Sequence, residues 1–118
     1  MDISAHELNG IAVLSLSGRL DLASGSQLKE EIKRYLESNV TSIHLTLAKV
    51  EFINSSGLGS LVSIMKEIRL LKGRFTMSDL ASYVREIFEI TQLSHIFEIF
   101  ATEDEALASY QQSSVTPS

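Results

Sequence analysis

Apolar and polar residues alternate at the start of the chain, as in strands that bury one face. Two such segments, Ile3–Leu8 and Ile11–Leu16, are separated by Asn9-Gly10, a dipeptide that strongly predicts a two-residue hairpin turn. A further turn is predicted at residues 18–21, which read Gly-Arg-Leu-Asp. The chain is therefore expected to begin with an antiparallel hairpin.

The next two segments differ in period. From about Ser24 to Ser38, apolar side chains recur every three or four residues, which predicts an amphipathic helix. The segment Ile43–Leu47 then alternates and predicts a strand, with His44 and Thr46 on its other face.

A longer helix is predicted from Ser56 to about Lys72, ended by Gly73. Its apolar residues form one broad stripe that is expected to face a sheet. The stripe consists of Leu58, Leu61, Val62, Ile64, Met65, Ile68 and Leu71. A short strand over residues 74–77 should follow this helix.

The remaining pattern predicts a helix capped by Asp79, a strand at Ile96–Phe100 and a last helix that begins near Thr102. Thr102 is followed three residues later by Glu105, which is the spacing of a capping box. Residues 113–118 contain the only proline and are expected to form a flexible tail.

The predicted element order is β-β-α-β-α-β-α-β-α, in a single domain over residues 1–112. Helices that alternate with strands favour an α/β fold. We expect a small mixed sheet flanked by helices, antiparallel in its first hairpin and largely parallel afterwards.

The composition of the chain excludes several classes of function. The chain has 118 residues, 44% of them hydrophobic, and a net charge of −5. It lacks a basic cluster and an apolar run of membrane-spanning length, so neither nucleic acid binding nor membrane insertion is expected. The absence of cysteine excludes disulfides and thiolate metal sites and fits a cytoplasmic protein.

The most informative segment is Phe52–Ser60, in which a strand-like stretch leads through Asn54, Ser55, Ser56 and glycines into a helix. The first turn of a helix presents unpaired N–H groups and the positive end of the helix dipole, both of which favour negative charge. The serines here have three interpretations: a helix cap, an anion site, or an acceptor of a phosphate group.

Enzyme signatures are absent or incomplete. Gly57-Leu58-Gly59 begins like a dinucleotide-binding turn, but Val62 stands where the third glycine belongs. The serines lack a Gly-x-Ser-x-Gly elbow. The three histidines, His6, His44 and His95, are scattered without ligand spacing. No catalysis, metal or cofactor is therefore expected.

The predicted central helix also carries a second strip, opposite its apolar stripe. This strip consists of Ser56, Gly59, Ser63, Lys66 and Leu70, at spacings of three and four residues. Most of its residues are small, which allows the backbone of another protein to come close. The strip therefore favours a docking face beside the serine pair.

With these motifs, the sequence resembles the STAS domains, and in particular the bacterial anti-sigma factor antagonists. The resemblance covers about residues 3–110. It rests on Leu-Ser-Gly-Arg-Leu-Asp at 16–21, Phe-Ile-Asn-Ser-Ser-Gly-Leu-Gly at 52–59, Phe-Glu-Ile-Thr-Gln-Leu at 88–93 and Glu-Ala-Leu at 105–107. The family's usual fold, a small mixed sheet with flanking helices, agrees with the predicted element order.

The resemblance implies partner switching. Such antagonists, when unphosphorylated, bind an anti-sigma factor that is also a serine kinase of the GHKL type, and thereby free the sigma factor. The kinase phosphorylates the first serine of the motif, here Ser55, and a PP2C-type phosphatase restores the binding form. Partner contacts are expected at Asn54, Ser56, Gly57, Gly59, Ser63, Lys66 and Leu70.

Two residues depart from the family pattern. Asn54 stands where the family usually has Asp, which keeps the capping ability but removes a charge. Gln92 replaces a common Gly. Alternative functions are a STAS scaffold or accessory module in a signalling or transport assembly, and a small domain that binds an anion or a nucleotide at the Ser-Ser-Gly turn.

Overall fold

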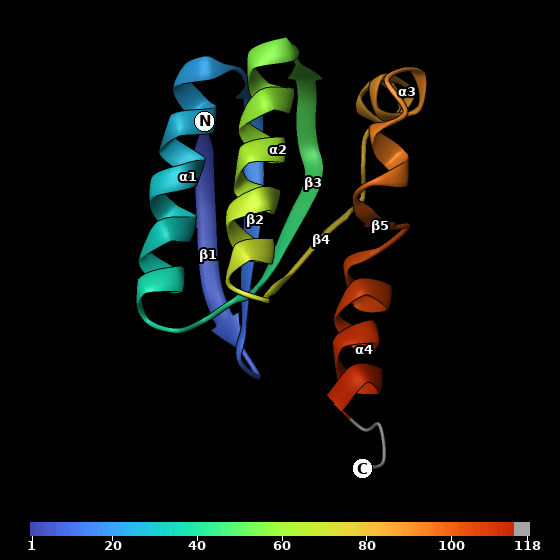
Figure 1. The fold of residues 1–118 in the computed structure, drawn as a ribbon. Helices are drawn as coiled ribbons and strands as arrows, with labels where there is room; N and C mark the ends of the chain where they lie inside the picture. Colours follow the sequence, from blue (N-terminus) through green and yellow to red (C-terminus); the bar gives the residue numbers. More distant parts are fainter. Residues whose placement is uncertain (115–118) are drawn as a thin grey trace.

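The structure is a computed structural model, and it describes residues 1–114. These residues form the predicted order of strands and helices (Figure 1). The elements are β1 (Asp2–Leu8), β2 (Ile11–Leu20), α1 (Leu22–Glu37), β3 (Ser42–Ile53), α2 (Ser55–Leu70), β4 (Arg74–Ser78), α3 (Ser82–Ile90), a 3-10 turn (Leu93–His95), β5 (Glu98–Phe100) and α4 (Glu103–Ser114).

The strands form one mixed sheet in the order β1-β2-β3-β4-β5. β1 and β2 are antiparallel, whereas the pairs from β2 to β5 are parallel, which confirms the predicted fold class. The hairpin turn is Asn9-Gly10, where both residues have positive φ, 53° and 80°. A two-residue turn with two positive φ angles matches the twist of the flanking strands.

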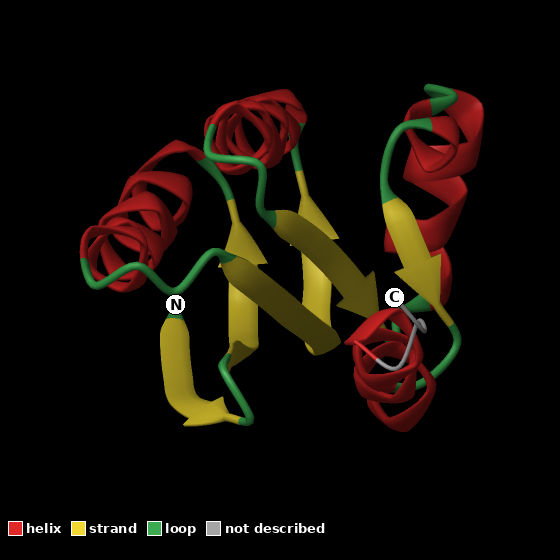
Figure 2. Cartoon of the chain, turned by 60° about the horizontal axis from the view of Figure 1, so that its bottom comes forward, coloured by secondary structure: helices red, strands yellow, loops and turns green. Residues whose placement is uncertain are grey.

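Helices cover the two faces of the sheet unequally (Figure 2). α1 and α2 lie side by side on one face, where Leu28 of α1 and Ile64 of α2 pack with Leu14 and Leu45 of the strands in the larger apolar core. α4 lies on the opposite face, where Tyr110 contacts residues of β2. α3 adds Val84 and Phe88 to the larger core.

The predicted turn at 18–21 is wrong, because β2 continues to Leu20. Gly18 has a φ of 117° and lies in β2 at a shift in the pairing with β3. Pairing then resumes with Arg19 opposite Phe52. A glycine adopts this backbone conformation without a steric penalty, so it bends the strand instead of ending it.

Two predicted helix boundaries are also wrong. The left-handed residue after α2 is Lys72, with a φ of 59°. Gly73 is needed for a different reason, because a Cβ there would lie 2.2 Å from the carbonyl oxygen of Thr41. Asp79 does not cap α3, since its own φ is 59° and the N-cap position is taken by Ala81, which forms no side-chain cap bond.

The last elements follow the prediction with shifted ends. Gln92, which replaces the family's glycine, has a φ of 62°, a conformation that favours glycine. The 3-10 turn after it delays β5 to Glu98. Thr102 accepts a hydrogen bond from the Glu105 N–H at 3.2 Å, as a cap should. The predicted tail overlaps α4 at residues 113–114, and residues 115–118 lie outside the described residues.

The polar side of β3 is buried at His44, where α4 packs against the sheet, and only half-buried at Thr46. His44 is fully buried, with Nδ1 2.7 Å from Oγ1 of Thr76 and Nε2 2.9 Å from Oγ of Ser78. The Tyr110 hydroxyl lies 2.9 Å from the Thr76 hydroxyl and donates to the Ile43 carbonyl at 3.0 Å. This polar network joins β3 and β4 to α4, so the helix is fixed to the sheet by hydrogen bonds as well as by packing.

The network predicts an acid-sensitive fold. Burial lowers the pKa of His44 to about 4, although the charges of Glu103 and Asp79 oppose the shift. The unfolded chain therefore takes up this proton near pH 6.5, whereas the folded chain takes it up only near pH 4. Stability from this group is complete above pH 6.5 and should fall by roughly 3 kcal/mol as the pH drops to 4.

Urea unfolding at several pH values checks this expectation. A His44→Gln variant should be less stable at pH 7 and should lose part of the slope between pH 6.5 and 4. His6, which is exposed, provides the matched control, and His6→Gln should keep the wild-type slope. Equal slopes in wild type and His44→Gln would contradict the assignment.

Candidate functional site

The candidate site lies where β3 ends and α2 begins. Asn54 is the N-cap of α2, with extended backbone at φ −112°, and its side chain accepts a hydrogen bond from the Gly57 N–H at 2.9 Å. Its own N–H donates to the Leu20 carbonyl at 3.2 Å. The cap therefore fixes the helix start both to its own first turn and to the neighbouring strand β2.

Ser55 is the first residue of α2 and is exposed. Among the described residues, no partner forms a hydrogen bond with its hydroxyl, because Asn54 already provides the cap. This excludes one of the three interpretations of the serines, because the asparagine, not a serine, caps the helix. The Ser55 hydroxyl is therefore accessible and is not needed to hold the helix start.

Gly57 was expected to contact a partner, but it is buried. A Cβ at this position would lie 2.2 Å from the carbonyl oxygen of Leu20 and 3.2 Å from a side-chain carbon of Ile53. Its absence of a side chain lets α2 approach the end of β2. Gly57 thus has a packing role in the site and cannot contact a partner through an exposed surface.

Most of the predicted docking strip is exposed. Ser56, Gly59, Lys66 and Leu70 are all accessible, and 83% of Leu70 is exposed. Ser63 differs, because it is only half-exposed and accepts a hydrogen bond from Nζ of Lys29 at 3.1 Å. α1 therefore borders the strip on one side.

The start of α1 adds residues that the sequence pattern did not indicate. Asp21 caps α1 and accepts from the Ser24 N–H at 3.1 Å, while Ser24 Oγ accepts from the Asp21 N–H at 2.8 Å. This backbone hydrogen bond from Ser24 holds the pKa of Asp21 below its usual range. Since Leu20 contacts Asn54 and Gly57, the helix starts of α1 and α2 are adjacent.

Arg19 and Phe52 form a second unpredicted feature at this edge. The guanidinium carbon of Arg19 lies 3.9 Å from the centre of the Phe52 ring, on paired positions of β2 and β3. The signal in the sequence was an Arg-Leu-Asp run directly before a helical pattern. This run also fits a turn, because β2 continues past Gly18 only through its pairing with β3, which the local sequence does not indicate.

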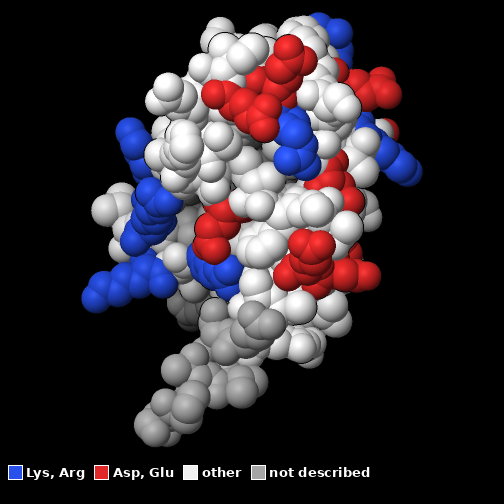
Figure 3. Space-filling view, turned by 90° about the vertical axis from the view of Figure 1, so that its right-hand side faces the viewer, with Lys and Arg blue, Asp and Glu red and all other residues white. Residues whose placement is uncertain are grey.

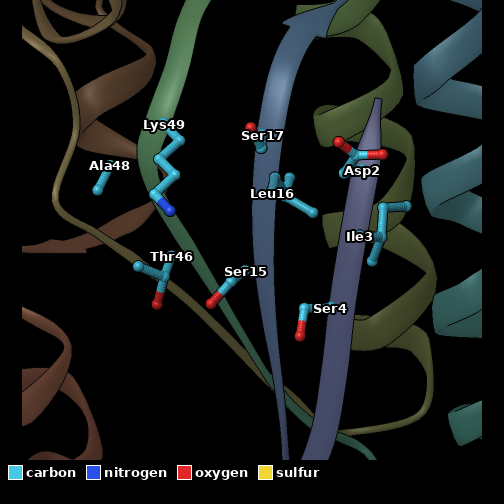
Figure 4. A pocket seen from close by; sticks show the side chains of 9 residues that line it. All are labelled: Asp2, Ile3, Ser4, Ser15, Leu16, Ser17, Thr46, Ala48 and Lys49. Atoms are coloured by element: carbon cyan, nitrogen blue, oxygen red, sulfur yellow. The ribbon is translucent and has the colours of Figure 1, made fainter.

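The open half of the other sheet face contains a hollow of about 410 Å³ (Figure 4). Hydroxyl groups of Ser4, Ser15 and Thr46 form a row across three adjacent strands, with Lys49 above it. A polar surface of this kind is typical of a sheet face that is exposed to water. Within residues 1–114, no group of three acidic or histidine side chains could hold a metal ion.

The charges agree with a protein partner better than with nucleic acid. On the face seen in Figure 3, acidic side chains form several groups, and basic side chains lie both along one edge and between these groups, without a continuous basic surface. Among the described helices, none is long and apolar enough to cross a membrane.

A family model of the STAS domain matches residues 2–106. This chain belongs to the STAS domain family. RsfB of Mycobacterium tuberculosis, an anti-sigma-F factor antagonist, is 30% identical to it over 105 residues, which are 89% of this chain and 85% of RsfB. The resemblance seen in the motifs thus extends over nearly the whole STAS domain.

Solved STAS structures share the fold. TM1081 of Thermotoga maritima superposes with a TM-score of 0.85 at 25% identity, covering 91% of this chain and 92% of TM1081. SpoIIAA, an anti-sigma factor antagonist solved in its unphosphorylated form, gives a TM-score of 0.74 at 23% identity and covers 93% and 98% of the two chains. Anti-sigma factor antagonists are regulators rather than enzymes, which confirms the expectation that the chain is not an enzyme.

Proposed function

We propose that this STAS domain is the phosphorylation-controlled member of a partner switch. Its unphosphorylated form binds an anti-sigma factor that is also a serine kinase of the GHKL type, and the sigma factor is released. Transfer of phosphate to Ser55 ends this binding. A PP2C-type phosphatase then removes the phosphate, and the whole cycle takes place in the cytoplasm.

The observation that carries the proposal is the state of Ser55. Its hydroxyl is exposed at the start of α2, and the cap that orders this helix is provided by Asn54. A kinase can therefore reach Ser55 without unfolding the turn. The related protein SpoIIAA has also been solved in a phosphorylated form, so this fold accommodates a phosphate group.

Electrostatics explain how a phosphate could switch binding without unfolding the domain. It adds a charge of about −1.5 to −2 beside the exposed strip of α2. The N-terminal end of a helix stabilises negative charge, so the domain itself should tolerate the group. A partner that covers the same surface must desolvate that charge, and the complex is weakened.

Asn54 directly precedes Ser55 and so lies next to the hydroxyl that would accept the phosphate. An aspartate here would cap α2 equally well, since both side chains accept a hydrogen bond from the first-turn N–H groups. The neutral amide keeps the cap and removes one negative charge next to Ser55. Capping of α2 therefore does not require a carboxylate at position 54.

Phosphopeptide mapping tests the proposal. The anti-sigma factor kinase co-purified with this chain from its own cells is incubated with the purified chain and ATP, and we expect a single phosphate on Ser55. Ser56→Ala should still be phosphorylated, whereas Ser55→Ala should not. Phosphate on Ser56 alone, or none on the wild-type chain with a kinase that phosphorylates itself or another substrate, would refute the proposed switch.

A further inference from the structure

α1 and α2 lie side by side (Figure 1). A groove between them borders the exposed strip of α2 at Ser63. The helices are in close contact at Gly25, where a Cβ would lie 2.2 Å from Oγ of Ser60. Beyond this point they are bridged by Lys29 and Ser63. The groove has a volume of about 420 Å³ and is lined by Ser26, Lys29, Glu30, Lys33, Ser63 and Glu67.

Lys29 is the distinctive group in this groove. It is half-buried, and its ammonium group donates to the neutral hydroxyl of Ser63. Among residues 1–114 it forms no ion pair with a carboxylate. An ammonium group has three donors, so Lys29 retains donors for a further acceptor. Because Lys29 is partly buried and forms no ion pair, a negatively charged acceptor is favourable.

The next positions along the groove are balanced in charge. One helical turn after Lys29 and Ser63 come Lys33 and Glu67, which have opposite charges. Glu30 follows Lys29 directly and is exposed. α1 and α2 together contain five Lys or Arg and four Glu, a net charge of +1, in a chain whose net charge is −5. This helix pair is thus less acidic than the chain as a whole and repels an acidic group less.

We propose that the groove binds a carboxylate side chain of the anti-sigma factor, with Lys29 as the principal donor. The proposal rests on the proposed function for the identity of the partner. The Lys29–Ser63 hydrogen bond makes the groove continuous with the exposed α2 strip, so a partner on that strip also covers Lys29. Ser63 then positions the ammonium group toward the interface.

The groove and Ser55 should act independently. Ser63 follows Ser55 by eight residues, a separation of about 12 Å along α2. Changes at sites this far apart usually add, because they share no contacts. The effect of losing Lys29 is therefore expected in addition to that of a negative charge at position 55.

Isothermal titration with the co-purified anti-sigma factor tests the inference. Lys29→Met, which keeps the length and the apolar stem of the side chain, should weaken binding at least about tenfold and reduce its salt dependence. Lys29→Arg should remain within about threefold of wild type. Lys49→Met is the matched control, because Lys49 is an exposed lysine on the opposite face of the sheet, and its affinity should be unchanged (Figure 4).

A charge swap identifies the acceptor. Lys29→Glu should abolish binding, and replacing one Asp or Glu of the partner by Lys should restore it. If the wild-type chain binds and Lys29→Met binds equally well, the groove is not part of the interface, while the partner switch stands. If the wild-type chain does not bind the anti-sigma factor at all, both proposals are overturned.

Discussion

Replacing Ser55 by Asp should weaken binding to the anti-sigma factor about 100-fold, equivalent to about 2.7 kcal/mol. The substitution places a permanent negative charge at the first position of α2, beside the exposed strip. Leaving one charge unpaired in an interface typically costs 2–5 kcal/mol. The measurement is titration calorimetry of the variant against the same kinase preparation used for wild type.

The stability of the domain should change by less than about 0.5 kcal/mol in Ser55→Asp, since a negative charge suits a helix N-terminus. Ser55→Asn is the matched control, because it has the shape of Asp without the charge and should bind nearly as wild type. Ser55→Ala should also bind and cost little stability, since Asn54 rather than Ser55 caps α2. Unfolding of Ser55→Asp would refute a local switch, and weak binding of both Asp and Asn would point to shape instead of charge.

Gly57→Ala should destabilise the domain by roughly 2 kcal/mol or more. The added Cβ would lie 2.2 Å from the Leu20 carbonyl oxygen, which is backbone and cannot rotate away. The start of α2 would have to move from β2, and the hydrogen bond from Asn54 N–H to Leu20 would stretch with it. Urea unfolding followed by far-ultraviolet circular dichroism measures the loss.

Gly59→Ala is the matched control in the same helix. Gly59 is exposed, and apart from its chain neighbours and the adjacent helix backbone no atom lies within 4 Å of where its Cβ would be. Removing a glycine from a helix interior should therefore stabilise the domain by about 0.5–1 kcal/mol. Opposite signs for two glycines only two residues apart would confirm that contact with Leu20, not helix propensity, determines the role of Gly57. Equal effects would contradict it.

The sequence predicted the element order because the local signals are strong. Asn9-Gly10 fixed the hairpin, the apolar stripe fixed α2, and Thr102 with Glu105 marked the start of α4. Each signal acts within a few residues, so it does not depend on the rest of the fold. The motif at 52–59 likewise located Ser55 at the start of a helix, since Asn54 is a strong N-cap residue and caps α2 within its own first turn.

Errors occurred where contacts between distant segments overrule the local pattern. Gly18 reads as a turn, yet pairing with β3 carries β2 through it to Leu20. Asp79 reads as a helix cap, yet its φ of 59° excludes that role. Gly57 reads as part of a docking motif, yet the approach of Leu20 buries it. For Gly18 and Gly57, the deciding neighbour is far away in the sequence.

The sequence alone therefore determined the α/β fold, the element order, the family resemblance and the position of Ser55. Only the tertiary structure decided the roles of the residues around that serine, with Asn54 as the cap and Gly57 as a packing residue. It also decided the hydrogen bond between Lys29 and Ser63, which are 34 residues apart. The burial of His44 was also decided there, because α4 covers its side of β3, whereas local alternation indicates only that His44 lies opposite the apolar residues. The period of the apolar residues indicates which side of a helix or strand is apolar. Whether the residues on the other side are buried depends on which element packs against them.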